Sequence, residues 1–592
     1  MKMKKIASFA LTLLLTLVIG INAFAVPYEN YVVTESGAYQ EPQAYVPKDV
    51  IDSTDIGVEN LEGKPLSSPQ DMLLYEKNGF FIVSDTGNNR LIVFKEDMRT
   101  VHQIISTWDN NGTEDSFKSN NGLAAFYPEN LLYVCDTSNR RIVVFEFDTE
   151  TNLLNFKLTY EDPGLAAYFS SAAQEMEKGE SDTVITPSPE PTVAPEGTPN
   201  PDSEEPEDEE IDTSTTTNQN TGSSIVYAPT KMVVDNAKRM FIVSKSCYLG
   251  LIELKSDGSF SKFFGATRTK QSLSSLLNRI FSAEAKKNLQ QNLSTEYSNV
   301  TIDEEGFIYG TISLLNAKDL SSHFSSSSEI GAALRKLNAA GSDVMMRQGL
   351  VPPSGDYGDS LNRSSYSYIV DATVSKNKLT SILDSQKGRV FTYTSTGELL
   401  YVFGGLGERK NEVTNKSTNI REEQVGYTEG TTLAPVAIEL LSDDETIVIL
   451  DSSGACLTVY KPTEYGLILR EAVNAHEERR YDDAENAWNK VLGMSSNSAI
   501  AYKGVGKIYY MKAAEYLDSD KQRDTYLEAA EFFKMGYSQK DYGKAFYKYR
   551  DKVLEQIMPA LMTIIIIVVA AILVFGWVKK FKYFVKTGGK RQ

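Results

Sequence analysis

The segment FFIVSDTGNNRLIVF, residues Phe80–Phe94, recurs 51 residues later as LLYVCDTSNRRIVVF, residues Leu131–Phe145. Each copy consists of two runs of apolar, β-forming residues around a polar turn. An Asp in the turn can accept hydrogen bonds from main-chain amides, Asn tolerates the tight backbone there, and the Arg five residues after the Asp can reach back to it. The turn residues of the two copies are Asp85, Asn88, Arg90, Asp136, Asn139 and Arg141. We therefore expect the repeating unit to contain a two-stranded hairpin.

Four weaker copies follow. Ser381–Tyr393 keeps Asp384 and Arg389 at the same spacing, whereas Ile447–Asp451 keeps Asp451 and has Cys456 in the Arg position. Two further copies retain only the first strand: Met240–Ser244 and Gly306–Gly310. Six units in one chain predict six sheets.

The first unit resembles an NHL repeat, and the matching positions are Pro69, Asp71, Gly79, Phe81, Val83, Asp85, Thr86, Gly87, Asn88 and Arg90. The resemblance implies a six-bladed β-propeller over residues 26–461, with one four-stranded sheet per blade. The sixth repeat runs directly into Lys461-Pro462-Thr463, which leaves it without an outer strand. We expect Tyr31–Thr34 to supply that strand and close the ring. A loose N-terminal arm is the alternative.

Three insertions interrupt the repeats. Residues 179–224 contain seven prolines, twelve acidic residues and no Lys or Arg, a composition typical of disorder, either as a spacer or as a tolerated insertion. Ser272–Asn292 has apolar residues at helical spacing, so a helix is expected whose apolar face packs on the propeller rim or binds a partner or the membrane surface. A second helix is expected over Ser328–Leu337.

After the propeller the apolar period changes from two to 3.6, and residues 462–556 are expected to be helical. Thr463 is the predicted N-cap. Large and small residues alternate as in tetratricopeptide hairpins, at Ala472, Tyr481, Ala484, Trp488, Gly506, Tyr509, Ala529 and Phe533. Two such units are fewer than a solenoid usually needs, so the domain is expected to lean on the propeller. It could present a peptide site or act as a rigid stalk.

Both termini carry apolar segments. Met558–Val578 contains 21 uncharged residues, roughly 30 Å of helix, which is enough to span a bilayer. Residues 579–592 carry six basic and no acidic residues, which places this tail in the cytoplasm. At the other end, three lysines precede Ile6–Ile21 and an Ala-Phe-Ala site, so residues 1–25 are expected to be a cleaved signal peptide. An uncleaved anchor is the alternative. The bulk of the chain is predicted to lie outside the cell membrane.

With both halves in view, the chain resembles membrane-anchored NHL and tetratricopeptide surface proteins of Gram-positive bacteria. The segments that carry this resemblance are Tyr45–Pro47, Glu296–Asp303, Leu334–Asn338, Gly388–Phe391, Leu400–Gly404 and Pro462–Gly466. The resemblance implies an accessory role at the cell surface, often beside carbohydrate-type ABC transporters, and implies no catalytic residues.

The charge and the reactive residues narrow the function. A net charge of −19 argues against nucleic-acid binding. The cysteines Cys135, Cys247 and Cys456 lie in separate predicted blades, so we interpret them as buried thiols, with a disulfide or a nucleophile as the alternatives. The three histidines are isolated and no catalytic motif occurs, so no catalytic, metal or cofactor residue is predicted.

Two functions remain open. The first is a non-enzymatic binding or scaffold protein with a protein or glycan partner outside the cell. The second is a metal-dependent, gluconolactonase-like hydrolase or lyase at the propeller channel, for which Asp71 and Asp235 precede central strands, although both are also typical turn residues. Carboxylates converging on the channel would favour the second function, and an apolar plug would oppose it. A purely structural spacer is a third possibility.

Overall fold

The computed structural model describes residues 28–165, 227–266 without 246 and 248, 296–313, 332–356, 366–407 and 430–588 without 587. One pair of short strands, 413–414 with 421–422, is described as well. The predicted signal peptide (1–25), the acidic insertion (179–224) and the predicted helix 272–292 lie outside the described residues.

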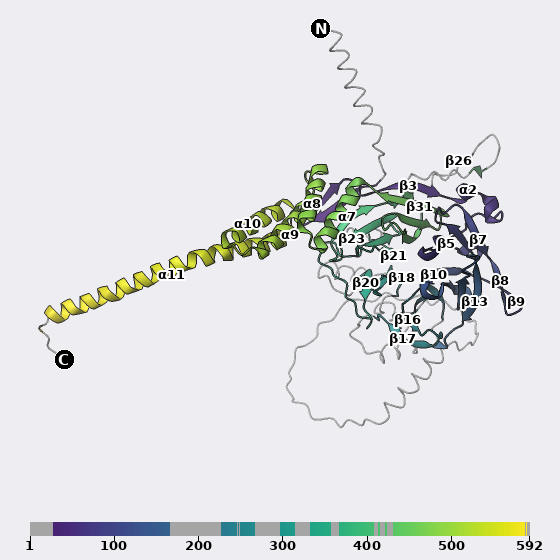
Figure 1. The fold of residues 1–592 in the computed structure, drawn as a ribbon, viewed down its shortest axis with the longest axis horizontal. Helices are drawn as coiled ribbons and strands as arrows, with labels where there is room; N and C mark the ends of the chain where they lie inside the picture. Colours follow the sequence, from purple (N-terminus) through teal and green to yellow (C-terminus); the bar gives the residue numbers. More distant parts are fainter. Residues whose placement is uncertain are drawn as a thin grey trace, which may run out of the picture.

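Six antiparallel sheets make up the larger part of the molecule (Figure 1). Blade one contains β4 (Asp71–Tyr75), β5 (Phe80–Asp85), β6 (Arg90–Lys95) and β7 (Val101–Ile105). Blade two contains β10 (Asn120–Phe126), β11 (Leu131–Asp136), β12 (Arg141–Phe147) and β13 (Leu154–Tyr160). Blade three contains β14 (Pro229–Val234), β15 (Met240–Ser244), β16 (Leu251–Leu254) and β17 (Phe260–Phe264).

The other half of the ring is built in the same way. Among the described residues blade four has three strands, β18 (Asn299–Ile302), β19 (Ile308–Thr311) and β20 (Leu334–Leu337). Blade five contains β21 (Ile369–Val374), β22 (Thr380–Asp384), β23 (Arg389–Tyr393) and β24 (Leu399–Phe403). Blade six contains β29 (Pro435–Leu440), β30 (Ile447–Asp451), β31 (Cys456–Pro462) and β3 (Tyr45–Ile51).

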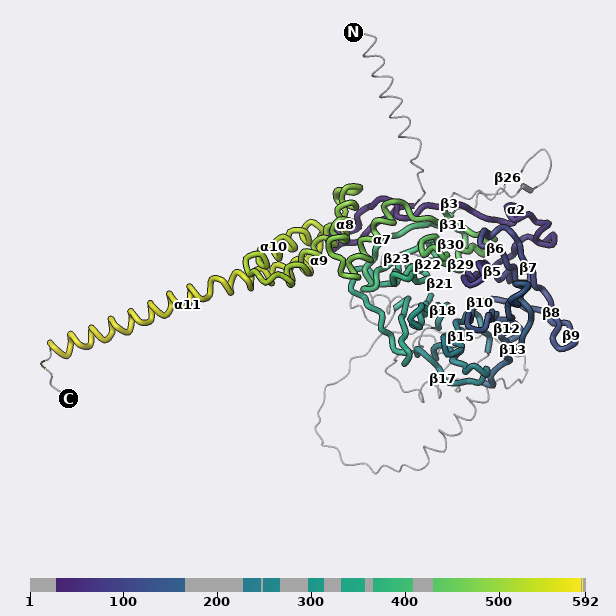
Figure 2. Tube along the Cα trace, viewed as in Figure 1, coloured from purple at the N-terminus to yellow at the C-terminus, as the bar shows by residue number. Residues whose placement is uncertain are grey.

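The blades close into a ring. Each innermost strand contacts the next in the order β4, β10, β14, β18, β21 and β29, and β29 returns to β4 (Figure 2). Apolar clusters fill the spaces between neighbouring blades, as expected when both faces of each sheet are covered. The predicted six-bladed propeller is therefore present.

The strand that closes blade six is β3, so the prediction of Tyr31–Thr34 for this role was wrong. β3 pairs with β31 along Tyr45–Ile51, and Tyr45 is fully buried and stacks on Phe403 of blade five with ring centroids 4.7 Å apart. Residues 30–34 instead form β1 (Asn30–Thr34), which pairs with β2 (Gly37–Glu41). The Asn30 side chain accepts a hydrogen bond from the Val402 amide, so this hairpin covers the outer strand of blade five.

The prediction of a helix over Ser328–Leu337 was also wrong in the part of this range that the structure describes, because residues 334–337 form β20. Leu334 and Leu337 belong to two different apolar clusters, on either side of the blade. Pairing with β19 buries both residues, which a helix with one apolar face would not do.

Smaller elements complete the propeller. They are α2 (Ser53–Ile56), η2 (Val58–Leu61), η3 (Glu76–Asn78), η4 (Thr86–Asn88), η5 (Tyr127–Glu129), η6 (Thr137–Asn139), β8 (Thr107–Asn110), β9 (Thr113–Ser116), β25 (Gly405–Leu406), β26 (Val413–Thr414), β27 (Arg421–Glu422) and β28 (Thr431–Thr432). The three cysteines are buried in blades two, three and six, and none forms a disulfide.

Five helices follow: α7 (Glu464–Glu477), α8 (Tyr481–Met494), α9 (Ala499–Glu515), α10 (Ser519–Met535) and α11 (Gln539–Lys586). The Thr463 side chain accepts a hydrogen bond from the Gly466 amide, which confirms the predicted N-cap. Consecutive helices pack on one another, and α11 packs on α10. The predicted packing residues lie in these contacts: Ala472, Ala484, Trp488, Gly506, Ala529 and Phe533 are buried, and Tyr481 and Tyr509 are partly buried.

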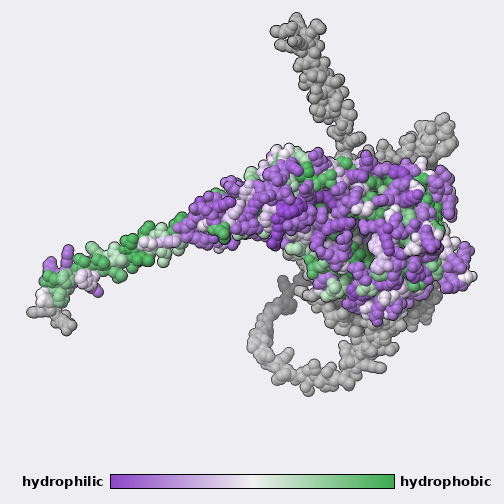
Figure 3. All heavy atoms as spheres, in the orientation of Figure 1, coloured by the Kyte–Doolittle hydropathy of each residue, from purple (hydrophilic) through white to green (hydrophobic). Residues whose placement is uncertain are grey.

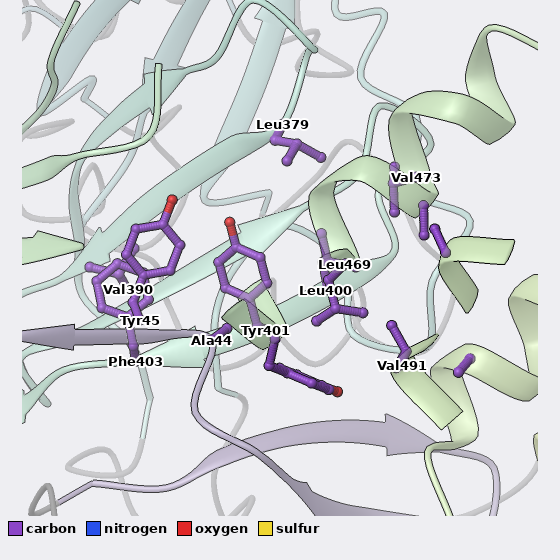
Figure 4. Close-up of a cluster of buried hydrophobic side chains, with 14 of the residues drawn as sticks. Ala44, Tyr45, Leu379, Val390, Leu400, Tyr401, Phe403, Leu469, Val473 and Val491 are labelled. Atoms are coloured by element: carbon purple, nitrogen blue, oxygen red, sulfur yellow. The ribbon is translucent and has the colours of Figure 1, made fainter. Parts of the chain in front are cut away.

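The helices share a core with the propeller. Leu469, Val473 and Val491 from α7 and α8 pack in one cluster with Leu400 and Tyr401 of blade five (Figure 4). Arg470 of α7 also donates to the Tyr45 hydroxyl at 3.2 Å. The helical region therefore cannot pivot freely on the propeller.

The last helix, α11, is 48 residues long, about 72 Å at 1.5 Å per residue. It continues through the apolar segment 558–578, with Pro559 inside the helix, so the end of the helical region and the predicted membrane segment form one helix. The apolar side chains of this segment are exposed (Figure 3), and α11 is the one described helix long and apolar enough to span a membrane.

Candidate functional site

The repeat turns hold neighbouring blades together. Arg90 Nε donates to Asp85 Oδ2 at 2.7 Å, and its other nitrogens donate to the carbonyls of Leu61 and Lys64. Asp85 also accepts from the Ser67 amide, so the pair fixes the loop that leads from blade six into blade one. Both side chains are buried, which gives this pair a structural role.

The second unit repeats this arrangement. Arg141 Nε donates to Asp136 Oδ2 at 2.8 Å, and the Asn139 side chain donates to the same carboxylate, as Asn88 does to Asp85. Arg141 also forms a bidentate pair with Asp115. The Arg141 guanidinium holds the pKa of Asp115 well below its usual range, at about 2.

The later units keep the Asp and lose the pair. Asp384 accepts from the amides of Tyr368 and Gln386, whereas Arg389 donates to Asp356 at 2.9 Å. Asp451 accepts from the amides of Ala434 and Gly454, and also from that of Leu433. The shared task of the Asp in all four units is therefore to bind main-chain amides.

The central channel is polar. A cavity of about 330 Å³ is lined by residues of all six inner strands. Asp71 of blade one pairs with Lys231 of blade three, with 2.6 Å between Oδ1 and Nζ. Asn299 of blade four, Asp371 of blade five and Glu439 of blade six also line the cavity, together with the hydroxyl-bearing Thr301 and Thr373.

Main-chain amides hold these carboxylates in place. Asp71 Oδ2 accepts from the Leu123 amide at 2.7 Å, and Asp371 Oδ2 accepts from the Ile438 amide at 2.8 Å. Glu439 Oε1 accepts from the Leu74 amide at 3.1 Å. Each bond joins two blades, so the channel carboxylates also tie the inner strands together.

Two channel carboxyls have raised pKa values that lie near neutral pH. Burial raises the pKa of Asp371 to about 7, opposed by the charge of Lys231 and reinforced by that of Asp71. Burial raises the pKa of Glu439 to about 8, and the Asp371 and Asp71 charges add to this effect although the Leu74 amide opposes it. The sites therefore change charge in the range where a general acid is useful.

Sequence reasoning identified Asp71 and missed its counterpart. Asp371 stands opposite Leu383, the residue before Asp384, just as Asp71 stands opposite Ser84, the residue before Asp85. The spacing from Asp371 to Asp384 is one residue shorter than that from Asp71 to Asp85, because the β21–β22 and β4–β5 connections differ in length, which hides the equivalence in the sequence. Lys231, Asn299 and Glu439 carry no such repeat signal.

Asp235, the other predicted channel residue, lies outside it. Its carboxylate accepts from Arg239 at 2.6 Å and from the amides of Ala237 and Arg239. It is a turn residue, as its propensity indicated.

A divalent cation needs several free oxygen ligands around one point. Asp71 is neutralised by the Lys231 ammonium, and each channel carboxylate is already engaged by a main-chain amide. Within the described part of the chain no group of three His, Cys, Asp or Glu side chains is arranged to hold a metal ion. The donor set as it stands does not fit a metal cage.

Comparison with known proteins gives distant propellers. No protein-family model and no curated relative matches the chain. A virginiamycin B lyase from Staphylococcus aureus is 10% identical, with 70% of this chain and 99% of that chain covered and a TM-score of 0.33. A gluconolactonase from Xanthomonas campestris is 9% identical, with 74% and 99% covered and a TM-score of 0.31. At this level of similarity no activity follows for this chain.

Proposed function

We propose that the protein is a membrane-anchored, extracytoplasmic binding and scaffold protein whose NHL-type propeller and tetratricopeptide-like helices are displayed at a fixed geometry. The observation that supports this role is the continuous packing that connects the propeller, through the helices, to the anchor. The core shared by blades five and six with α7 to α9 is followed by α10 and by the single rod of α11. Such rigidity suits a protein that positions a partner.

The position of the apolar segment supports the anchor. Nineteen residues of α11 precede Met558, and this stretch packs on α10 as far as Gln556, whose side chain bonds to Arg523 and Asp520, so the apolar segment begins where the helical region ends. The basic tail 579–592 favours a cytoplasmic C-terminus. The proposed partner is a protein or glycan at the cell surface, with a component of an ABC transport system as one form of it. This follows the resemblance to Gram-positive surface proteins.

Protease treatment of intact cells tests the orientation. An epitope in the propeller should be lost, while a C-terminal fragment that contains the anchor and residues 579–592 should be retained. A cytoplasmic marker protein serves as the control for lysis. Survival of the whole polypeptide in intact cells, with digestion only after lysis, would contradict the proposal.

Crosslinking in intact cells tests the scaffold role. The wild-type protein should capture a defined surface component. A variant with a twelve-residue Gly/Ser linker after Ile557, beyond the packing of α11 on α10, keeps the propeller and the anchor but removes the rigid connection. We expect the linker variant to lose capture of that component while the amount of the variant at the cell surface stays unchanged. Full capture by the linker variant would show that a rigid connection is not required.

A hydrolase or lyase at the channel is the second candidate, and the convergence of Asp371 and Glu439 near the Asp71–Lys231 pair favours it. A carboxyl with a pKa of about 8 is protonated at neutral pH and can donate a proton to a leaving group. Turnover of lactone or ester probes that is lost in Glu439→Gln, with the fold intact, would establish it. The absence of turnover across such a panel, with and without added divalent metal, would reject it.

A further inference from the structure

A second cavity lies where the propeller, the N-terminal hairpin and the helices meet. Its volume is about 380 Å³, within the range of small-molecule pockets. Its walls come from β1, from the Gln348–Val351 segment, from α9 and from the first turns of α11. Apolar parts of these walls include Val33, Leu350 and Met511.

The charge in this cleft differs from that of the whole chain. The protein carries a net charge of −19, yet the cleft is lined by four lysines, Lys503, Lys507, Lys540 and Lys544. Three carboxylates face them: Glu398, Asp541 and Glu35. Glu35 is engaged by the main-chain amides of Gln539 and Lys540 at the start of α11, at 2.8 and 3.4 Å. Four ammonium groups therefore face three carboxylates in the cleft lining, an excess of one positive charge.

Two of these lysines share one carboxylate. Lys503 Nζ lies 2.9 Å from Glu398 Oε1, and Lys507 pairs with the other oxygen. Burial would raise the pKa of Glu398, but the charges of Lys507 and Lys503 outweigh it and lower the pKa to about 2. Glu398 is thus ionised and compensates one of the two charges, while Asp541, 3.8 Å from Lys503 Nζ, partly offsets the other.

A recess of about 100 Å³ opens beside these lysines and shares Glu398, His476, Lys503 and Lys507 with the cleft. Its lining also includes Glu477, whose carboxylate accepts a hydrogen bond from the Ser395 hydroxyl. Trp488 also lines the recess; it is 4% exposed, and its Nε1 has no hydrogen-bond partner among the described residues. His476 Nδ1 is likewise buried without a partner in the described chain. Buried donors without partners cost free energy, so these atoms point to a ligand that supplies an acceptor.

We propose that this cleft binds a small amphipathic carboxylate, whose charged group enters the recess between Lys503, Lys507 and Trp488 and whose apolar part lies against β1 and α9. The indole N–H of Trp488 donates to the carboxylate, and the ammonium groups of Lys503 and Lys507, whose charge Glu398 compensates only in part, attract it. Because burial and then Lys507 lower the pKa of His476, its imidazole is neutral at pH 7 and can carry a proton on Nδ1. The site is separate from the channel and does not depend on the proposed function.

Phenylacetate is a suitable probe, with the full-length protein in detergent micelles. Titration calorimetry should show saturable binding, and the emission of Trp488 should change with the same midpoint. The uncharged isostere phenylacetamide should bind at least about tenfold more weakly, because it loses the charge-assisted bonds. Equal binding of the amide, or no saturable binding of phenylacetate up to about 10 mM, would overturn the proposal. Binding of inorganic phosphate in its place would also overturn the carboxylate assignment.

Two variants locate the site. Lys507→Met should weaken phenylacetate about tenfold, whereas Lys512→Met on the same helix, whose ammonium pairs with Asp482 and Glu485, should leave binding unchanged. Lys544→Glu, at an exposed rim position, keeps the recess intact and should also weaken binding. Unchanged affinity in both Lys507→Met and Lys544→Glu would overturn the proposal, with thermal unfolding used to verify that each variant is folded.

Discussion

Lys231 and Asp71 form an ion pair across the central channel, 2.6 Å between Nζ and Oδ1, although blade two lies between the strands that carry them. The close approach depends on Gly122 of blade two, because a Cβ there would lie 2.6 Å from the Lys231 Cα. Both side chains are about nine-tenths buried. The pair therefore links two blades that are not neighbours.

Lys231→Met should destabilise the propeller strongly. It leaves the Asp71 carboxylate buried without its counter-charge, a change that typically costs about 3–5 kcal/mol. The double variant Asp71→Asn/Lys231→Met should recover much of this loss. Lys238→Met removes the more exposed pair with Glu129 and should cost about 1 kcal/mol or less. Urea unfolding followed by near-UV circular dichroism measures all three, and equal losses for Lys231→Met and Lys238→Met would contradict the expectation.

Glu439→Gln should flatten the dependence of stability on pH. The pKa of the folded-state Glu439 carboxyl is raised to about 8, so between about pH 4 and pH 8 the folded state binds more protons than the unfolded state. The contribution of this group is thus greatest at low pH and falls as the pH rises through that window. The unfolding free energy of wild type minus that of the variant should decline with pH, by up to about 1.4 kcal/mol per unit.

The side-chain carbonyl oxygen of the Gln variant can still accept a hydrogen bond from the main-chain amide of Leu74, so the fold should persist. Glu445→Gln, at an exposed position of the same blade, is the control and should leave the curve unchanged. A difference curve for Glu439→Gln that is flat between pH 4 and pH 8 would show that this carboxyl ionises normally.

Arg90 and Arg389, which occupy equivalent repeat positions, should differ in how much they contribute to the free energy of unfolding. Arg90 is 1% exposed and binds Asp85 and two carbonyls, so Arg90→Met should cost about 3–5 kcal/mol. Arg389 is about one-third exposed in its pair with Asp356, so Arg389→Met should cost about 1 kcal/mol or less. Thermal unfolding of both variants makes the comparison, and similar losses would mean that the burial of the pair is irrelevant.

Gly466→Ala should loosen the contact between α7 and the propeller. A Cβ at this position would lie 2.1 Å from the Ala44 carbonyl oxygen, so the helix must shift, at a cost of about 1–3 kcal/mol. Gly493→Ala on α8 is the matched control, because nothing lies within 4 Å of its Cβ. That change should stabilise the helix by up to about 1 kcal/mol. Hydrogen exchange of α7 amides should rise only in Gly466→Ala; faster exchange in both variants would contradict this interpretation.

Local patterns in the sequence determined the repeating hairpin, the six sheets, the Thr463 cap and the apolar segment 558–578. These features follow from alternation, spacing and turn chemistry within short stretches, which act wherever the chain folds. The buried Asp85–Arg90 geometry is of this kind, since the two residues face each other across one turn.

Tertiary structure decided everything that depends on which distant strands meet. β3 closes blade six because it pairs with β31, which lies at the far end of the propeller sequence, and the 334–337 segment is a strand because β19 offers it a partner. The channel pair Lys231–Asp71 and the lysines around Glu398 likewise join residues that no local spacing connects. Closure of the ring brings them together, because burying the edges and faces of all six sheets at once is what lowers the free energy.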